Sequence, residues 1–350
     1  MEKYFAAANT ESGFFSLFDE VFSPERLRRL YILKGGPGTG KSTLMGNIGF
    51  VAESMGYDVE YIACSADPHS LDGVLIPALS VAVLDGTAPH VTEPVYPGVS
   101  ERIINAEEAF DYKFLEKKRE EIMFLLHSKK EAYRTAYRFL AAAGSLERER
   151  EALIASAFLR EKAEAAVKRL LASFHNIRKG AQKQRYISAI SCEGIQTLDT
   201  LRSRAKKIYA VTDKYGSGCY FMNILYETVC AEKLASVICP TPLIRAHKEA
   251  VFLEGEDVLF ILSDEKTPEN SDKIINTMRF IRKEALSERK GRLRFSEKCE
   301  ESVMEGALAA LSEAGAFHGK AEKIYSDSVD FSKIEVMKMK MISEIFENKV

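Results

Sequence analysis

The segment YILKGGPGTGKSTLM, residues 31–45, constrains the fold of this chain more strongly than any other. Within it, Gly35, Gly40, Lys41 and Ser42 satisfy the spacing G-x-x-x-x-G-K-[ST]. An apolar stretch precedes the glycines and a helix-forming stretch follows them, and this context separates the motif from a chance match. The segment therefore predicts a strand, a glycine-rich loop and a helix, as found in α/β folds.

The same outline occurs again in YAVTDKYGSGCYFMN, residues 209–223, where Gly216 and Gly218 align with Gly38 and Gly40. Features on either side of the two loops follow in the same order. The pairs are KYFAAANT with RYISAISC, VEYIAC with LASVIC, and LSVAVLDGTAP with VLFILSDEKTP. We therefore predict a tandem duplication of a P-loop NTPase-like module. The alternative is that two generic α/β segments look alike by pattern alone.

The duplication divides the chain near Gly180, into domains at residues 1–182 and 183–350. Short apolar runs in each half, such as LYIL, VEYIA and LSVAVL, lack polar alternation. Such runs are typical of parallel strands buried on both faces, so each module is predicted to contain a parallel sheet. The run VLIPALSVAVL is broken by Pro77 and is too short to span a bilayer, so it is interpreted as two buried elements.

Each module is followed by a charged segment with apolar residues at helical spacing, at about residues 101–179 and 272–348. In the first segment Gly144 and the serine after it suggest a turn, and hence an antiparallel helical hairpin. In the second, Gly291 and Gly315 suggest breaks. We expect these helical arms to pack against each other or to offer an interface to a protein partner. A substrate lid is the alternative.

Charge and cysteine usage exclude several classes of protein. The net charge is −2 and the pI about 6.4, so nucleic-acid or membrane binding is not expected. The basic runs at 201–207 and 289–294 are interpreted as solvated helix faces. The six cysteines contain no C-x-x-C pair, and no signal segment or long apolar run is present. A cytoplasmic protein with reduced thiols is therefore expected.

The glycine-rich loop is predicted to bind the phosphates of a nucleotide, because its amide groups can form a concave nest at a helix N-terminus. Lys41 would neutralise the β and γ oxygens, and the Ser42 hydroxyl would bind Mg²⁺. Other P-loop proteins, which this segment resembles, place the residue at Thr43 near the α-phosphate. The predicted binding residues are Gly35, Gly36, Pro37, Gly38, Thr39, Gly40, Lys41, Ser42 and Thr43.

Asp85 follows the apolar run LSVAVL and fits the Walker B carboxylate that holds Mg²⁺. The alternative is a turn residue, since Gly86 comes next. Many P-loop ATPases have a glutamate at the position of Gly86, so the catalytic group must come from elsewhere. Asp67 and His90 are the weaker catalytic candidates in loops at the carboxyl ends of strands. Asp72, in the same segment as Asp67, also fits a helix start.

In the second loop Lys41 is replaced by Cys219, Ser42 by Tyr220 and Gly35 by Asp213. These exchanges remove a cation and a Mg²⁺ ligand and add a carboxylate, and all of them oppose triphosphate binding. The second half is therefore predicted to be an inactive partner of the first. The acidic pair at 264–265 is interpreted as a solvated strand end.

The whole chain resembles an uncharacterised family of bacterial tandem P-loop ATPase-like proteins. Five segments carry this resemblance: YILKGGPGTGKSTLM, CSADPHSLDGV, VAVLDGTAPH, RYISAISCEGI and HGKAEKIYSDSVDF. The resemblance implies ATP binding with hydrolysis, and it implies no particular substrate. The second loop of this chain departs from the family pattern, because the corresponding loop in the other family members looks closer to a true Walker A motif.

These observations predict a Mg²⁺-dependent ATPase that uses only its N-terminal site. ATP is favoured over GTP because no N-K-x-D guanine motif follows the loop. A small-molecule or nucleotide kinase is one alternative, because the glutamate after Asp85 is missing. A scaffold that binds ATP without hydrolysing it is the other.

Overall fold

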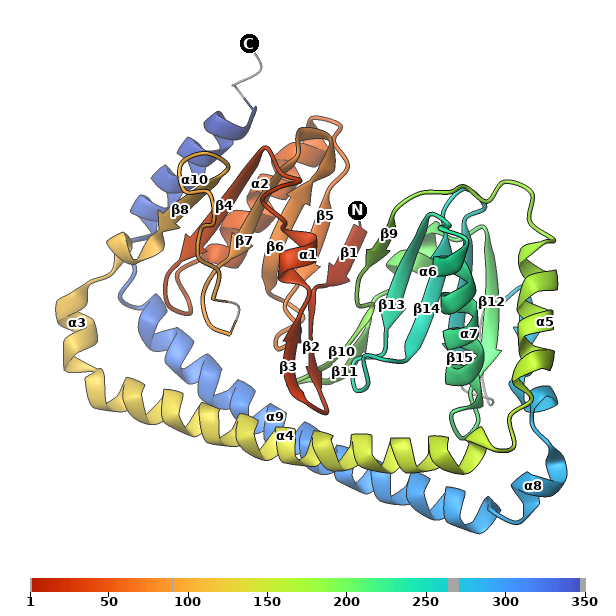
Figure 1. Cartoon of the computed structure of the whole chain (residues 1–350). Helices are drawn as coiled ribbons and strands as arrows, with labels where there is room; N and C mark the ends of the chain where they lie inside the picture. Colours follow the sequence, from red (N-terminus) through yellow and green to blue (C-terminus); the bar gives the residue numbers. More distant parts are fainter. Residues whose placement is uncertain (1, 90, 264–270, 347–350) are drawn as a thin grey trace.

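The computed structural model describes residues 2–89, 91–263 and 271–346. Two β-sheets lie above a pair of long helices that run beneath both of them (Figure 1). We call residues 2–109 the N-terminal module and residues 182–280 the C-terminal module. The first arm, residues 112–171, follows the N-terminal module, and the second arm, residues 283–346, follows the C-terminal module.

The helices and strands of the first part of the chain follow one another in a βαβ order. They are β1 (Glu2–Phe5), β2 (Ala7–Thr10), β3 (Gly13–Ser16), α1 (Phe18–Val21), β4 (Arg29–Lys34), α2 (Lys41–Ser54), β5 (Glu60–Ala63), β6 (Leu71–Ile76), η1 (Pro77–Leu79), β7 (Val81–Asp85), β8 (Glu101–Asn105) and η2 (Ala106–Ala109). The first arm contains α3 (Tyr112–Lys117), α4 (Arg119–Ala155) and α5 (Arg160–Leu171).

The second part repeats this order, except that η1 has no counterpart between β14 and β15. It contains β9 (Gln182–Gln184), β10 (Ser188–Ser191), β11 (Gly194–Thr197), α6 (Thr200–Arg204), β12 (Lys207–Thr212), α7 (Ser217–Ala231), β13 (Ser236–Pro240), β14 (Lys248–Leu253), β15 (Val258–Ser263), β16 (Lys273–Ile275) and η3 (Thr277–Phe280). The second arm contains α8 (Lys283–Ser287), α9 (Lys290–Ser326) and α10 (Phe331–Phe346).

The two large sheets have six strands each, in the orders β1-β5-β6-β7-β4-β8 and β9-β13-β14-β15-β12-β16, and the hairpins β2-β3 and β10-β11 form two-stranded sheets. In each large sheet one strand, β6 or β14, runs antiparallel to both neighbours, and the remaining pairs are parallel. The chain is α/β as expected, but the prediction of wholly parallel sheets is wrong. The physical reason is connection length: only residues 77–80 separate β6 from β7, and a parallel pair needs a crossover of about a dozen residues or more.

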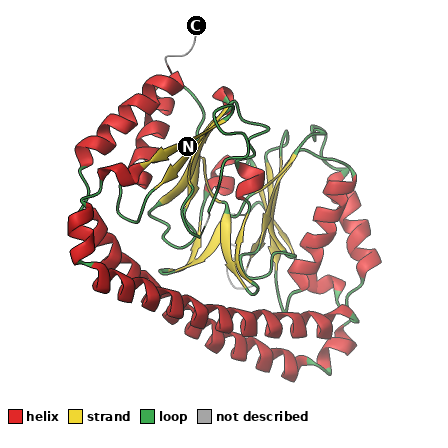
Figure 2. Cartoon of the chain, turned by 60° about the vertical axis from the view of Figure 1, so that its left-hand side comes forward, coloured by secondary structure: helices red, strands yellow, loops and turns green. Residues whose placement is uncertain are grey.

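Helices cover the outer face of each sheet (Figure 2). Ile334 and Met341 of α10 pack with Met45 and Ile48 of α2 on the first sheet. On the second sheet, residues 163–171 of α5 pack against α7 in the same way. The short helices and the inner faces form a core to which both modules contribute.

The two modules are joined by main-chain hydrogen bonds as well as by this core. Phe5 and Tyr186 exchange both of their backbone hydrogen bonds, each 2.9 Å long. Arg185 forms a buried ion pair with Glu60 of the N-terminal module. A buried ion pair that joins the two modules must be kept intact, because removing one partner leaves an uncompensated charge.

The long helices α4 and α9 run antiparallel, and each carries its arm from one module to the other (Figure 1). The first arm leaves the N-terminal module along α4 and ends with α5 on the C-terminal module. The second arm returns along α9 and ends with α10 on the N-terminal module. Each module is thus completed by a helix from the arm that follows the other module.

The predicted helical hairpin within residues 101–179 is wrong, because α4 continues through Gly144 as a single helix. Gly144 has another role: a Cβ atom there would meet the Glu11 side chain at the tip of the β2–β3 hairpin. In the second arm the predicted break at Gly315 is absent, since Gly315 lies inside α9, whereas a break does occur at residues 288–289, just before Gly291. The arms also begin later than about 101 and 272, because β8 and β16 come first.

Among the described residues, no helix is both long enough and apolar enough to cross a membrane.

Candidate functional site

The glycine-rich loop connects the end of β4 with the start of α2, as its sequence predicts. Gly38 and Gly40 have φ angles of 71° and 79°, which glycine adopts at little cost. The turn at Gly40 starts α2 directly, so Lys41 is the first helical residue. The loop therefore presents the N-terminus of a helix at the carboxyl end of a central strand, where its dipole favours an anion.

Lys41 is folded back into this loop and is only 8% exposed. Its ammonium group donates to the carbonyl oxygens of Gly35 and Gly36, each at 2.8 Å, and to Thr39 Oγ1 at 3.3 Å. Burial lowers the pKa of Lys41, while the carboxylates of Asp85, Glu322 and Glu107 oppose that shift. Several acidic groups thus surround the lysine that the sequence assigns to phosphate.

Asp85 ends β7 and lies beside Leu33 of β4 in the sheet. Its Oδ2 is 3.6 Å from Lys41 Nζ, and its Oδ1 accepts hydrogen bonds from Thr87 N and Oγ1 at 3.0 and 2.6 Å. The carboxylate is thereby held toward the loop. In the first turn of α2, Ser42 Oγ accepts a hydrogen bond from Leu71 N at 2.9 Å.

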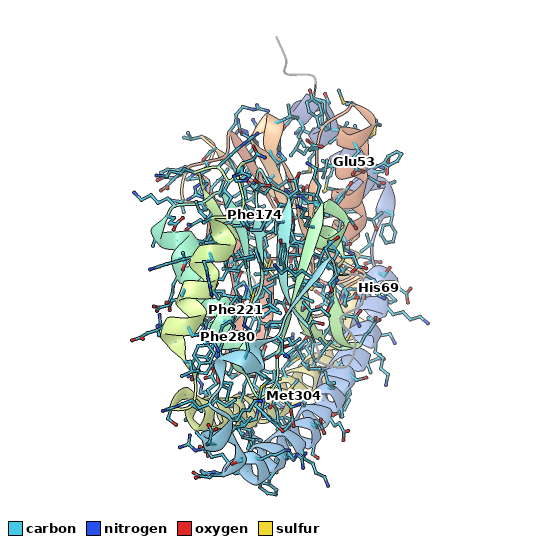
Figure 3. All side chains as sticks on the ribbon, turned by 90° about the vertical axis from the view of Figure 1, so that its right-hand side faces the viewer. Glu53, His69, Phe174, Phe221, Phe280 and Met304 are labelled. Atoms are coloured by element: carbon cyan, nitrogen blue, oxygen red, sulfur yellow. The ribbon has the colours of Figure 1, made fainter. Side chains whose placement is uncertain are left out.

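The other residues suggested by the sequence lie elsewhere or are not described. His90 lies outside the described residues. Asp67 accepts a hydrogen bond from the amide of His69 within its own loop, and its charge partly opposes the lowering of the His318 pKa described below. His69 is at the surface, paired with Glu193 at 3.1 Å (Figure 3). Asp72 is buried in β6, so its expected role as a helix start is wrong.

The sequence did not predict that α9 would cover the loop. A Cβ atom at Gly36 would lie 3.2 Å from the Tyr325 ring, and one at Gly38 would lie 2.5 Å from the main-chain oxygen of Glu322. Phe331, at the start of α10, approaches Gly40. These residues belong to HGKAEKIYSDSVDF, a segment that carries the family resemblance, and that was the available signal.

A second contact between the arms lies close to the loop. Lys129 Nζ of α4 and His318 Nδ1 of α9 are 3.1 Å apart. Burial and the charges of Lys129 and Lys41 lower the pKa of His318 to about 4. The imidazole is therefore neutral at physiological pH.

The second loop differs from the first in its backbone as well as in its chemistry. Gly216, which aligns with Gly38, has a φ of 88° and directly precedes α7, so α7 begins two aligned positions earlier than α2. The carboxylate of Asp213 accepts a hydrogen bond from Gly218 N at 2.7 Å. Cys219 Sγ lies 3.5 Å from the other Asp213 oxygen. A loop amide that could face a phosphate is thus occupied by a side chain of the same loop.

No family model, curated protein or solved structure matches this chain. The resemblance to bacterial tandem P-loop ATPase-like proteins therefore stays a prediction from the sequence segments named above.

Proposed function

We propose that this chain binds MgATP at the loop Gly35–Thr43 together with Asp85 and hydrolyses it, with the C-terminal module as an inactive partner. The observation that carries the proposal is the pairing of Lys41 with Asp85 at 3.6 Å, across the carboxyl ends of neighbouring strands. The loop supplies the ammonium group of Lys41 for the phosphates of a nucleoside triphosphate. Asp85, at the end of the neighbouring strand, supplies a carboxylate for its Mg²⁺ ion.

The residues present suit a magnesium ion. Ser42 and Asp85 offer the hydroxyl and carboxylate oxygens that Mg²⁺ prefers. When bound, Mg²⁺ would neutralise charge on the phosphate oxygens. Asp85 would exchange its pairing with Lys41 for the cation, and Lys41 would exchange two loop carbonyls for phosphate oxygens. Asp85 would keep a positively charged partner, and Lys41 would gain charge-assisted hydrogen bonds in place of two bonds to neutral carbonyl groups, which limits the cost in free energy.

The packing of α9 on the loop supports a further candidate, an ATP-gated scaffold. Glu322 and Tyr325 contact the two glycines that must accommodate phosphate, and α9 connects them to the C-terminal module. A change in the loop on nucleotide binding would therefore reach the paired arms. This candidate needs tight binding without turnover.

The test measures nucleotide affinity and product formation for wild type, Lys41→Ala and Asp85→Asn. Loss of the ammonium group is expected to weaken ATP binding about 100-fold, in line with about 3 kcal/mol for a lost charged hydrogen bond. Asp85→Asn is expected to remove the magnesium dependence of binding. ADP formed with free phosphate supports an ATPase, and ADP formed only with an added acceptor identifies a kinase.

Lys214→Ala is the matched control, because Lys214 lies in the corresponding loop of the C-terminal module. It is expected to bind ATP as wild type does. Wild-type affinity in Lys41→Ala, or loss of binding in Lys214→Ala instead, would overturn the assignment of the site.

A further inference from the structure

Three kinds of metal-binding side chain meet at the loop of the C-terminal module. Cys219 takes the position that Lys41 has in the first loop, His247 precedes β14, and Glu147 lies on α4 of the first arm. One ligand atom from each lies within 4.8 Å of the other two. The three come from segments far apart in the sequence, so the fold alone assembles them.

The position of His247 suggests how such a site would be ordered. The ring is 4% exposed, and its Nδ1 lies 3.0 Å from Glu147 Oε1. Its Nε2 pairs with Glu151, one turn further along α4. A histidine that binds a metal through one nitrogen usually donates its other N–H to a carboxylate, which fixes the ring. Glu151 is placed for that role, and Glu147 for direct binding.

The donor set matches the preferences of one ion. Zn²⁺ binds thiolate, imidazole and carboxylate groups at about 2.0 to 2.3 Å in tetrahedral sites, which sets ligand atoms about 3.3 to 3.8 Å apart. The separations here are within reach of that geometry after small side-chain movements. Asp213, whose Oδ2 lies 3.5 Å from Cys219 Sγ, offers a fourth donor. Magnesium and calcium prefer all-oxygen sites and fit this set poorly.

We propose that Cys219, His247 and Glu147, with Asp213, form a zinc-binding site that fastens α4 of the first arm to the C-terminal module. In the aligned sequences Cys219 stands at the position of Lys41 in the N-terminal module. The exchange of lysine for cysteine thus replaces an ammonium group, which suits an anion, by a thiol, which suits a metal ion. This inference does not depend on nucleotide binding at Lys41.

The competing explanation needs no metal. His247 as an imidazolium ion between Glu147 and Glu151 would also hold α4 in place through two charge-assisted hydrogen bonds. That arrangement does not involve the thiol of Cys219. The role of Cys219 therefore separates the two explanations.

The test uses the full chain, freed of metal with a chelator and then titrated with Zn²⁺. Wild type is expected to bind one zinc per chain, measured by elemental analysis after gel filtration. With Co²⁺ as the probe, a thiolate-to-metal absorption band should appear. Cys219→Ser and Glu147→Gln should weaken zinc binding at least 10-fold, and Glu151→Gln should weaken it about 10-fold to 100-fold through the histidine.

Cys230→Ser is the matched control, because Cys230 lies on the same helix α7, away from this cluster. It should bind zinc as wild type does. Circular dichroism checks the folding of each variant, and Glu147→Gln carries the test if Cys219→Ser does not fold. Absence of stoichiometric zinc in wild type, or wild-type affinity in the folded Cys219→Ser or Glu147→Gln variant, would overturn the proposal.

Discussion

At the scale of single residues, charge distinguishes the two glycine-rich loops. Lys41 is buried against two carbonyl groups and Asp85, whereas Cys219 at the corresponding position lies beside Asp213. Both loops start a helix from a glycine with a positive φ angle. However, α2 begins at Lys41 and α7 begins two aligned positions before Cys219, at Ser217, so the loops differ in backbone as well as in side chains.

His318 allows a test of the electrostatics around the first loop. Lys129, Lys41 and Asp67 face the ring, and its pKa is lowered to about 4. A histidine with a depressed pKa contributes stability at pH values above its unfolded pKa of about 6.5, and this stability is lost as the pH falls toward 4. Between pH 7 and pH 5 the wild type should lose about 2 kcal/mol more unfolding free energy than His318→Gln.

Urea unfolding at the two pH values, followed by circular dichroism, measures this difference. His127→Gln is the control, since His127 is exposed on α4. It should keep the pH dependence of wild type. Equal losses in wild type and His318→Gln would show that the ring does not remain neutral in the folded protein.

At the scale of elements, glycines inside the long helices mark the places where β-hairpins approach. Gly144 of α4 faces Glu11 between β2 and β3, and Gly315 of α9 faces Cys192 between β10 and β11. A side chain at either position would fill space that the hairpin occupies. Glycine lowers the helix propensity at these positions, but it allows the hairpins to pack closely against the helices.

Gly315→Ala and Gly319→Ala test this explanation on one helix. A Cβ atom at Gly315 would lie 2.7 Å from Cys192 Cβ, whereas none of the described atoms lies within 4 Å of one at Gly319. Gly315→Ala should lower the free energy of unfolding by about 1 to 3 kcal/mol through overpacking. Gly319→Ala should raise it by about 0.5 to 1 kcal/mol through helix propensity. Equal effects in chemical unfolding would contradict the close-contact role.

At the scale of the whole molecule, the exchange of arms makes the two modules interdependent. The first sheet is covered by α10 from the end of the chain, and the second by α5 from its middle. The inner core also draws residues from both modules. Unfolding either module would therefore expose apolar surface of the other, and a single cooperative transition is expected.

Met341→Ala on α10 and Leu171→Ala on α5 test this interdependence. Both side chains are at least 95% buried, on different sheets, and each loss should cost about 2 to 5 kcal/mol. Both variants should lower the midpoint of the same calorimetric transition. Met339→Ala, at a position 58% exposed on α10, should leave it unchanged. Two transitions, with only one shifted by each variant, would show that the modules unfold separately.

Much of the structure of the first loop could be predicted, because residues that are adjacent in the sequence specify it. The spacing of Gly35, Gly40 and Lys41 and the apolar run before them predict the strand, loop and helix that the structure has. Asp85 at a strand end was predicted in the same way. The antiparallel direction of β6 was missed, although the short connection to β7 could have indicated it.

The sequence by itself determined the two βαβ modules, the loop at Gly35–Thr43 and the chemical difference between Lys41 and Cys219. Only the tertiary structure decided that α9 covers that loop and that Glu147 and His247 meet Cys219. An apolar helical stripe shows that a face is buried but carries no information about which surface buries it. Contacts between residues a hundred or more positions apart depend on how all the elements pack together, so local patterns do not determine them.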